Sequence, residues 1–455
     1  MKIVIVGAGK VGVALTRHLA VENKVTVIDQ NPHLVENIIN IYDVMGVCGN
    51  GASYDVQKEA DVEQADLLIA TTSSDEINIL TCLVAKKMGV QHTIARIRSP
   101  EYGRQLRFMR SELGLSMAIN PEAATAREIA RVLRFPTAMK LESFSKGRLE
   151  LVEYRVAEHT ALDGTRLSEL YRNFKVRVLI CAVARQGETI IPSGDFTLRA
   201  GDKIYLTAAP RDLEKFFRLL GVFRARASSV MIVGASKMCY YLASELLEMG
   251  MSVKIIDQNE QRCVEMSERL PRALVIVGDG TDSELLSEEG ISQTDAFVAI
   301  TGLDEANILM ALSAAKQSGD CCKVVAKINR KSLLDLVSTE SLIDSVVSTG
   351  AVTTELILQY IRAMKNASAS KVKTLHRIVD EKVEALEFSV TPDIPFAGVP
   401  LRDLNLKRGL LLAGIVRQNG QIVIPSGNDV LHLHDDVIVV TTDTQLEDLR
   451  DILAE

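Results

Sequence analysis

The 455-residue chain lacks any long uninterrupted apolar run. No segment approaches the roughly 18 uncharged residues that a membrane helix needs, so we expect no membrane span. Excess basic charge is missing as well: the formal net charge is −7 and the pI is about 5.7, which argues against nucleic acid as a partner. The amino terminus is typical of a β-strand rather than of a signal peptide. We therefore expect a cytoplasmic protein.

Metal-binding and disulfide motifs are also missing. The seven cysteines include no C-x-x-C pair and are interpreted as reduced thiols. The seven histidines are scattered along the chain. His432 and His434 are two residues apart but have no third ligand nearby, so no metal site is expected.

What the sequence does contain is a duplication. The opening segment MKIVIVGAGKVG has the same layout as SVMIVGASKMC, which begins at Ser229. Further segments return in the same order: VTVIDQN as VKIIDQN, GNGAS (49–53) as GDGTD (278–282), and IIPSGD (190–195) as VIPSGN (423–428). Two copies of one multi-part unit therefore fill the chain.

Each copy has two parts that differ in their pattern of apolar residues. The first part alternates continuous apolar strands with helical periodicity, which predicts a doubly wound parallel sheet covered on both faces. The second part has short alternating segments divided by turn signals, which predicts a small β-rich module. We therefore expect an α/β protein with two Rossmann-like sheets, each followed by a small α+β lobe, over residues 1–137, 138–220, 228–366 and 372–455.

The first copy carries G-x-G-x-x-G at Gly7, Gly9 and Gly12, directly after an apolar strand. In a dinucleotide-binding turn these glycines permit the tight turn, the approach to a pyrophosphate and the packing of helix on sheet. Asp29 stands at the end of the second strand, where an acid accepts hydrogen bonds from ribose hydroxyls and repels the 2′-phosphate of NADP. The structural alternative is a glycine set that serves helix packing alone.

Further polar residues follow the later strands of the first copy. Asn50 follows the third strand, Thr72 and Ser73 follow the fourth, and Arg96 ends the fifth. The carboxyl ends of parallel strands form the ligand-binding edge of such a sheet. Arg96 is interpreted either as a phosphate ligand or as part of a surface salt bridge.

In the second copy, Ser236 and Cys239 replace the second and third glycines, while Asp257 keeps the acid. A Cβ atom then stands where the backbone would approach phosphate. The second half is therefore either a nucleotide site with Asp257 as its ribose ligand or a scaffold.

Taken together, these motifs make each half resemble an RCK (also called KTN) unit, and the whole chain resembles the TrkA family of regulatory subunits of Trk potassium uptake systems. The resemblance implies NAD(H), or ATP or ADP, bound in the first half. It also implies a homo-oligomeric ring, from dimer to tetramer, docked on a TrkH- or TrkG-type membrane subunit at the inner face of the membrane. The implied nucleotide contacts are Gly7, Ala8, Gly9, Lys10, Val11, Asp29, Thr72, Ser73 and Arg96.

Two other classes of function compete with this one. An NAD-dependent oxidoreductase would use the same Rossmann unit, but it requires a positioned acid or base and a substrate pocket. The β-rich modules offer no such constellation, so we expect no catalytic residues and no enzyme activity. A structural scaffold without ligand response is the third class.

Overall fold

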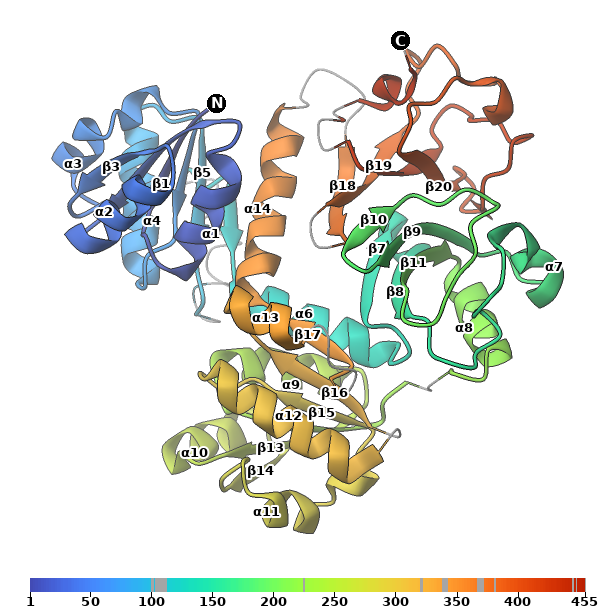
Figure 1. Ribbon diagram of the computed structural model, residues 1–455. Helices are drawn as coiled ribbons and strands as arrows, with labels where there is room; N and C mark the ends of the chain where they lie inside the picture. The colour runs from blue at the N-terminus through green and yellow to red at the C-terminus, as the bar shows by residue number, and fades with distance from the viewer. Residues whose placement is uncertain are drawn as a thin grey trace. The chain divides into compact units, whose positions relative to one another are not determined.

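Over the residues that it describes, the computed structural model contains four β-sheets in chain order, two parallel and two antiparallel (Figure 1). The α/β fold class expected from the sequence is confirmed. The expected boundary at 366 lies outside the described part of the chain, as do Cys321 and most of the segment 100–114. The structure describes residues 1–99, 102, 113–223, 226–319, 322–337, 343–365, 372–379, 382–443, 446 and 448–454.

The first Rossmann lobe is a parallel sheet of order β3-β2-β1-β4-β5-β6. Its strands are β1 (Lys2–Val6), β2 (Lys24–Asp29), β3 (Met45–Cys48), β4 (Leu67–Ala70), β5 (His92–Arg96) and β6 (Met117–Ile119). Its helices are α1 (Lys10–Leu19), α2 (Pro32–Ile41), α3 (Tyr54–Glu59) and α4 (Asp75–Lys87), and α6 (Pro121–Arg134) follows β6. The reversal of strand order between β1 and β4 creates the edge at which such folds bind ligands.

The second Rossmann lobe repeats this topology in the order β14-β13-β12-β15-β16-β17. Its strands are β12 (Ser229–Val233), β13 (Ser252–Asp257), β14 (Leu274–Val277), β15 (Ala296–Ala299), β16 (Lys323–Lys327) and β17 (Ser345–Val347). Its helices are α9 (Lys237–Glu248), α10 (Glu260–Arg269), α11 (Ser283–Glu288), α12 (Asp304–Ser318) and α13 (Lys331–Val337), followed by α14 (Thr349–Lys365).

Continuous apolar sequence produces the central strands of both sheets. All four residues of β4 and of β15 are buried, as expected for strands covered by helices on both faces. An antiparallel strand with one face exposed to solvent would instead alternate apolar and polar residues. The continuous runs therefore specify the parallel layers.

The small lobes that follow the two Rossmann lobes, called the first and the second C-lobe, are antiparallel sheets. The first C-lobe has the order β10-β9-β11-β8-β7 and the second C-lobe the order β18-β19-β22-β20-β21. The first contains β7 (Lys140–Phe144), β8 (Leu149–Arg155), α7 (Leu170–Phe174), β9 (Leu179–Arg185), β10 (Glu188–Ile190), β11 (Lys203–Ala208) and α8 (Pro210–Leu219). The second contains β18 (Val372–Ile378), β19 (Val383–Ser389), β20 (Leu410–Val416), β21 (Ile422–Val423) and β22 (Asp436–Thr441).

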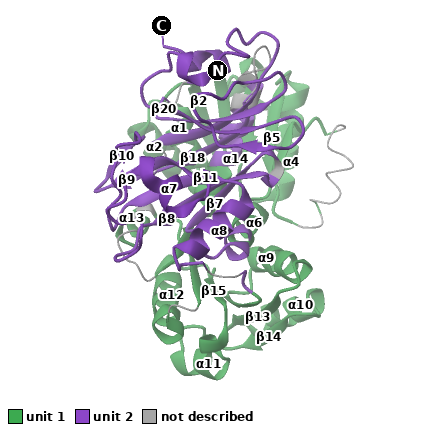
Figure 2. Ribbon diagram, turned by 90° about the vertical axis from the view of Figure 1, so that its right-hand side faces the viewer, with its two compact units in different colours: residues 1–130, 228–354 green, residues 131–227, 355–455 purple. Residues whose placement is uncertain are grey.

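The four lobes are grouped across the two halves of the sequence. One compact unit combines the two Rossmann lobes, residues 1–130 and 228–354, and the other combines the two C-lobes, residues 131–227 and 355–455 (Figure 2). Over the described residues, no helix has both the length and the apolar character that a membrane span requires.

Candidate functional site

The turn after β1 brings the first Rossmann lobe's glycines against the end of β4. Gly7 has φ +104°, a conformation that residues with a Cβ rarely adopt, and its added Cβ would lie 2.9 Å from the Thr72 backbone nitrogen. Its N–H donates to the Ile28 carbonyl at 2.8 Å. Gly7 is therefore required by the turn and by its close neighbours.

Gly9 and Gly12 have different roles. A Cβ at Gly12 would lie 1.8 Å from the Gly7 carbonyl oxygen, so helix packing excludes any larger residue there. A Cβ at Gly9 would meet no described atom within 4 Å. Packing of the protein on itself therefore accounts for Gly12, whereas the space in front of Gly9 is open to a ligand.

Helix α1 begins at Lys10 with Gly9 as its N-cap, and within the described residues no side chain caps it. The first amides of a helix have no intrahelical acceptor and carry a partial positive charge. Lys10 is exposed, whereas Ala8 and Val11 are buried against the lobe. An uncapped helix terminus behind an open glycine turn fits the pyrophosphate of a dinucleotide.

Asp29 ties this turn to β2. One carboxylate oxygen accepts from the Ala8 amide at 2.7 Å and the other from the Asn31 amide at 2.8 Å. A carboxylate has about four acceptor positions, so it retains capacity for ribose hydroxyls. Asp29 thus has a structural role in addition to the one expected from the sequence.

The ends of β4 and β5 are joined through Asn78 on α4. Its Oδ1 accepts from the Thr72 amide at 2.8 Å and from the Thr72 hydroxyl at 2.7 Å, while its Nδ2 donates to the Arg96 carbonyl at 2.8 Å. Asn78 is completely buried. Sequence reasoning missed this residue, although its recurrence as Asn307 in the repeated D-E-x-N segment was a usable signal.

Arg96 reaches back toward the same edge. Its guanidinium donates to the Thr71 carbonyl at 3.5 Å and lies 3.8 Å from the Glu122 carboxylate. Burial lowers the pKa of Arg96, against the opposing charge of Glu122. The buried Arg96 Nε and Glu122 Oε2 atoms have no hydrogen-bond partner within the described residues. A guanidinium with an unused donor at this position fits a phosphate group.

The other expected site residues lie on the loops beside this edge. Asn50 is exposed after β3 and accepts from the Ala52 amide at 3.1 Å, which shapes its own loop. Ser73 is exposed after β4, and its carbonyl accepts from the Arg98 guanidinium. These contacts bring together the glycine turn, Asp29, Thr72 and Arg96, whereas the Asn50 side chain shapes its own loop and the Ser73 carbonyl binds Arg98.

The equivalent turn in the second Rossmann lobe is closed by its own atoms. The Ser236 amide donates to the Gly234 carbonyl at 3.0 Å, and the Ser236 hydroxyl accepts from the Cys239 amide at 3.4 Å, so a side chain caps α9. Cys239 is fully buried, and burial raises the pKa of its thiol. Donors that are open in the first lobe are thus occupied in the second.

The backbone contacts of Asp257 explain why an acid recurs at this position in both halves. It accepts from the Ala235 amide at 2.7 Å and from the Asn259 amide at 2.8 Å, as Asp29 does from Ala8 and Asn31. The same two backbone bonds are needed to hold either turn on its sheet. Recurrence of the acid therefore reports turn structure in both lobes, and a ribose contact by Asp257 stays a prediction.

Comparisons with known proteins agree with this architecture. The TrkA-N domain matches residues 3–121 and 230–349, and the TrkA-C domain matches residues 151–221 and 385–454. The "Trk system potassium uptake protein TrkA homolog" of Archaeoglobus fulgidus is 32% identical over 453 residues, covering 99% of this chain and 100% of the relative. The "Trk system potassium uptake protein TrkA" of Vibrio alginolyticus is 32% identical over 448 residues, covering 97% and 94%.

Solved structures show the same fold. The "GsuK channel bound to NAD" aligns with a TM-score of 0.62 at 20% identity, over 98% of this chain and 77% of that chain. The "GsuK bound to ADP" aligns with a TM-score of 0.50 at 16% identity, over 79% and 69%. With both domain types matched twice in alternating order and near-complete coverage by the relatives, the chain belongs to the TrkA family.

Proposed function

We propose that this chain is a nucleotide-binding regulatory subunit that controls a membrane potassium-uptake protein and catalyses no reaction itself. Two relatives named as Trk system potassium uptake proteins support the transport role. The observation that carries the nucleotide role is the uncapped start of α1 behind the open space at Gly9. A ligand at this edge contacts several loops at once, so it can bias the arrangement of a lobe.

The proposed ligand is NAD(H), or ATP or ADP, in the first Rossmann lobe. The amides of α1 would hold the phosphates, Asp29 would accept hydrogen bonds from ribose hydroxyls, and Arg96 would neutralise phosphate charge. Structural neighbours described as bound to NAD and to ADP support this class of ligand. The closed turn at Ser236 favours the scaffold role for the second Rossmann lobe.

The remaining proposals follow from family membership. We place the chain in the cytoplasm, as a homo-oligomeric ring of two to four copies docked on a TrkH- or TrkG-type subunit at the inner membrane face. The net charge of −7 does not favour direct binding to anionic lipid, so protein contact is the expected route. The alternative, an NAD-dependent oxidoreductase, makes the different prediction that bound NADH is consumed.

A reconstitution experiment separates these functions. The purified chain is mixed with a Trk-type membrane subunit in liposomes, and potassium flux is measured without nucleotide and with NADH, ATP or ADP. We expect the chain to bind the subunit and at least one nucleotide to change the flux. Binding without any nucleotide effect would support a scaffold, and steady NADH oxidation would support the oxidoreductase. Absence of both binding and flux change would contradict the proposal.

A further inference from the structure

Glu142 and His376 occupy the same position in the two C-lobes. Glu142 lies two residues before Phe144, the last residue of β7, and His376 lies two residues before Ile378, the last residue of β18. Each pairs with the third residue of the following strand, Leu151 in β8 and Ala385 in β19. The duplicated lobes therefore carry an acid and a base at equivalent places.

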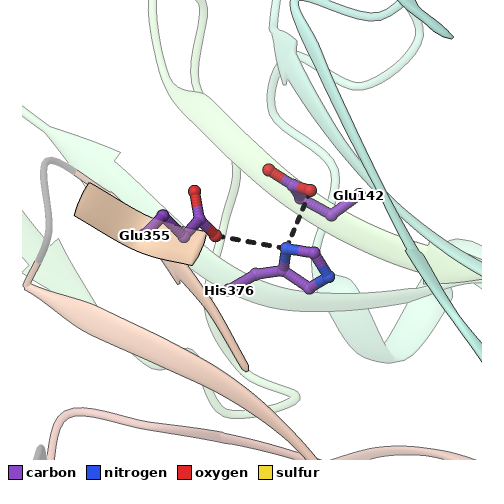
Figure 3. Close-up of side chains that lie close together, drawn as sticks. All are labelled: Glu142, Glu355 and His376. Atoms are coloured by element: carbon purple, nitrogen blue, oxygen red, sulfur yellow. Dashed lines mark hydrogen bonds and ion pairs between the residues drawn. The ribbon is translucent and has the colours of Figure 1, made fainter. Parts of the chain in front are cut away.

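These two equivalent residues meet each other. His376 Nδ1 lies 2.8 Å from Glu142 Oε2 and 3.2 Å from Glu355 Oε1 on α14 (Figure 3). Lys140 Nζ lies 2.8 Å from the other Glu142 oxygen, and Arg131 lies 3.3 Å from Oε2. Glu142 and His376 are 3% and 8% exposed, so the contact is almost shielded from water.

The cluster holds a proton between the lobes. Burial by itself lowers the pKa of His376, but the charge of Glu142 and the hydrogen bonds to Glu142 and Glu355 raise it to about 10. Burial likewise raises the pKa of Glu142, but the charges of His376 and Lys140 hold it below its ordinary value. The contact at neutral pH is thus between an imidazolium and a carboxylate.

A divalent cation fits the same atoms less well. The ligand atoms of Glu142, Glu355 and His376 lie within 4.8 Å of one another, which is compatible with a metal. However, Lys140 and Arg131 already place two positive charges against Glu142. A metal would displace the proton from His376 and add charge to an already cationic site.

The apolar surface around the cluster does not favour one pairing of C-lobes over another. One buried cluster joins the hairpin ends of both C-lobes, with Phe144 and Leu149 from the first and Ile378 and Val383 from the second. These residues also occupy equivalent positions, because Phe144 pairs with Leu149 and Ile378 with Val383. Apolar burial is non-directional, so it would accept two copies of the same lobe as readily as one of each.

We propose that Glu142 and His376 select the partner of each C-lobe, so that the first C-lobe pairs with a second C-lobe and not with another first C-lobe. Two first C-lobes would place Glu142 against Glu142, with four cations from two copies of Lys140 and Arg131 around them. Two second C-lobes would place His376 against His376. Only the mixed pair sets an acid against a base, and like charges brought together disfavour the wrong partners.

A second polar contact also favours the mixed pair of C-lobes. The Ser145 hydroxyl donates to Glu387 Oε1 at 2.8 Å, and the Ser145 amide donates to Glu387 Oε2 at 3.2 Å. Ser145 directly follows β7, and the residue that directly follows β18 is Val379, which has no side-chain donor. The mixed pair of lobes therefore gains a hydrogen bond that two second C-lobes would lack at this position.

The proposal is tested on the full-length chain by isotope-resolved cross-linking. Unlabelled and ¹⁵N-labelled chains are mixed, unfolded, refolded together at high concentration and treated with a lysine-reactive cross-linker. In the wild type we expect links between the two C-lobes and no mixed-isotope links joining two first C-lobes. Abundant mixed-isotope links between first C-lobes of the wild type would overturn the proposal, whatever the variants do.

The decisive variant removes both charges. Glu142→Gln/His376→Gln should remain folded, because a neutral hydrogen-bonding pair replaces the buried ion pair. It should lose selectivity, so that mixed-isotope links between first C-lobes rise severalfold. His376→Gln alone should lower the unfolding temperature on the order of 10 °C, because it leaves Glu142 facing Glu355 without the imidazolium.

Arg127→Gln is the matched control. Arg127 is the seventh residue of α6, as Glu355 is of α14, but it is exposed. Its link pattern should equal that of the wild type. If the double variant also keeps the wild-type pattern, tethering within one chain selects the partner and the proposal fails. Stoichiometric bound zinc, or a fall in unfolding temperature on adding EDTA, would overturn it in favour of a metal site.

Discussion

The Tyr241 hydroxyl donates to the backbone carbonyl of Arg98 at 3.0 Å and joins the two Rossmann lobes. Tyr241 lies on α9 of the second lobe, and its hydroxyl also accepts from Asn120 Nδ2 of the first lobe at 2.8 Å. Burial raises the pKa of Tyr241, so the hydroxyl remains a donor at neutral pH. Since Arg98 follows Arg96 by two residues, the contact sits next to the proposed phosphate ligand.

We expect Tyr241→Phe to lower the free energy of unfolding by about 1–2 kcal/mol, because it removes the hydroxyl that joins Arg98 and Asn120. Chemical denaturation of the full chain measures this change. Tyr240→Phe on the same helix is the control, because its ring contact with Arg269 does not need the hydroxyl. Equal effects of the two substitutions would show that the lobes do not depend on this hydrogen bond.

Gly9→Val should weaken nucleotide binding at least about tenfold, or about 1.4 kcal/mol, because its side chain fills the space before α1. The fold should tolerate it, since no described atom lies within 4 Å of the added Cβ. Calorimetric titration with NADH, ATP and ADP measures the affinity. Ser236→Val, in the turn closed by Ser236, is the control and should leave the affinity unchanged. If Gly9→Val binds nucleotide with wild-type affinity, the turn is not part of the binding site.

Asp29 should favour NAD over NADP, and Asp29→Ala should reduce this preference by about 1–3 kcal/mol. The substitution also frees the Ala8 and Asn31 amides, which weakens both ligands alike. The ratio of the two dissociation constants therefore reports the ribose contact alone. Asp257→Ala removes the same two backbone bonds in the second lobe and should leave the ratio unchanged. A wild-type ratio in Asp29→Ala would leave Asp29 with only its structural role.

The contribution of His376 to stability should disappear at alkaline pH. Its pKa is raised from 6.5 to about 10 in the folded chain, so its stabilisation is complete below pH 6.5 and is lost as the pH rises to about 10. The charged groups around the ring are Glu142 and Lys140 on β7, Arg131 on α6 and Glu355 on α14.

Denaturation of wild type and His376→Gln at a series of pH values measures this contribution. The difference in free energy of unfolding between the two should be largest near pH 6 and should shrink toward pH 10. A difference that stays constant over this range would mean that the ring is neutral in the folded protein.

The sequence by itself determined the local structure of this protein and much of its candidate site. Continuous apolar runs predicted the parallel strands, because a strand buried on both faces has no position for polar residues. The glycine turn was predicted from its spacing, because Gly7 and Gly12 occupy places where a Cβ would collide with backbone. Both signals are local, because each depends only on residues that lie close together in the sequence.

Only the tertiary structure decided how repeated residues divide their roles. The sequence predicted a ribose contact for Asp29 and left Asp257 as either a ribose ligand or part of a scaffold. In the structure, Asp29 and Asp257 each accept from two backbone amides, and these contacts depend on the fold of the turn. Sequence reasoning also treated His376 as one of several scattered histidines. Its meeting with Glu142 depends on packing between lobes that lie far apart in the chain. Local patterns specify elements, whereas the partner of a buried charge is set by which surfaces come together.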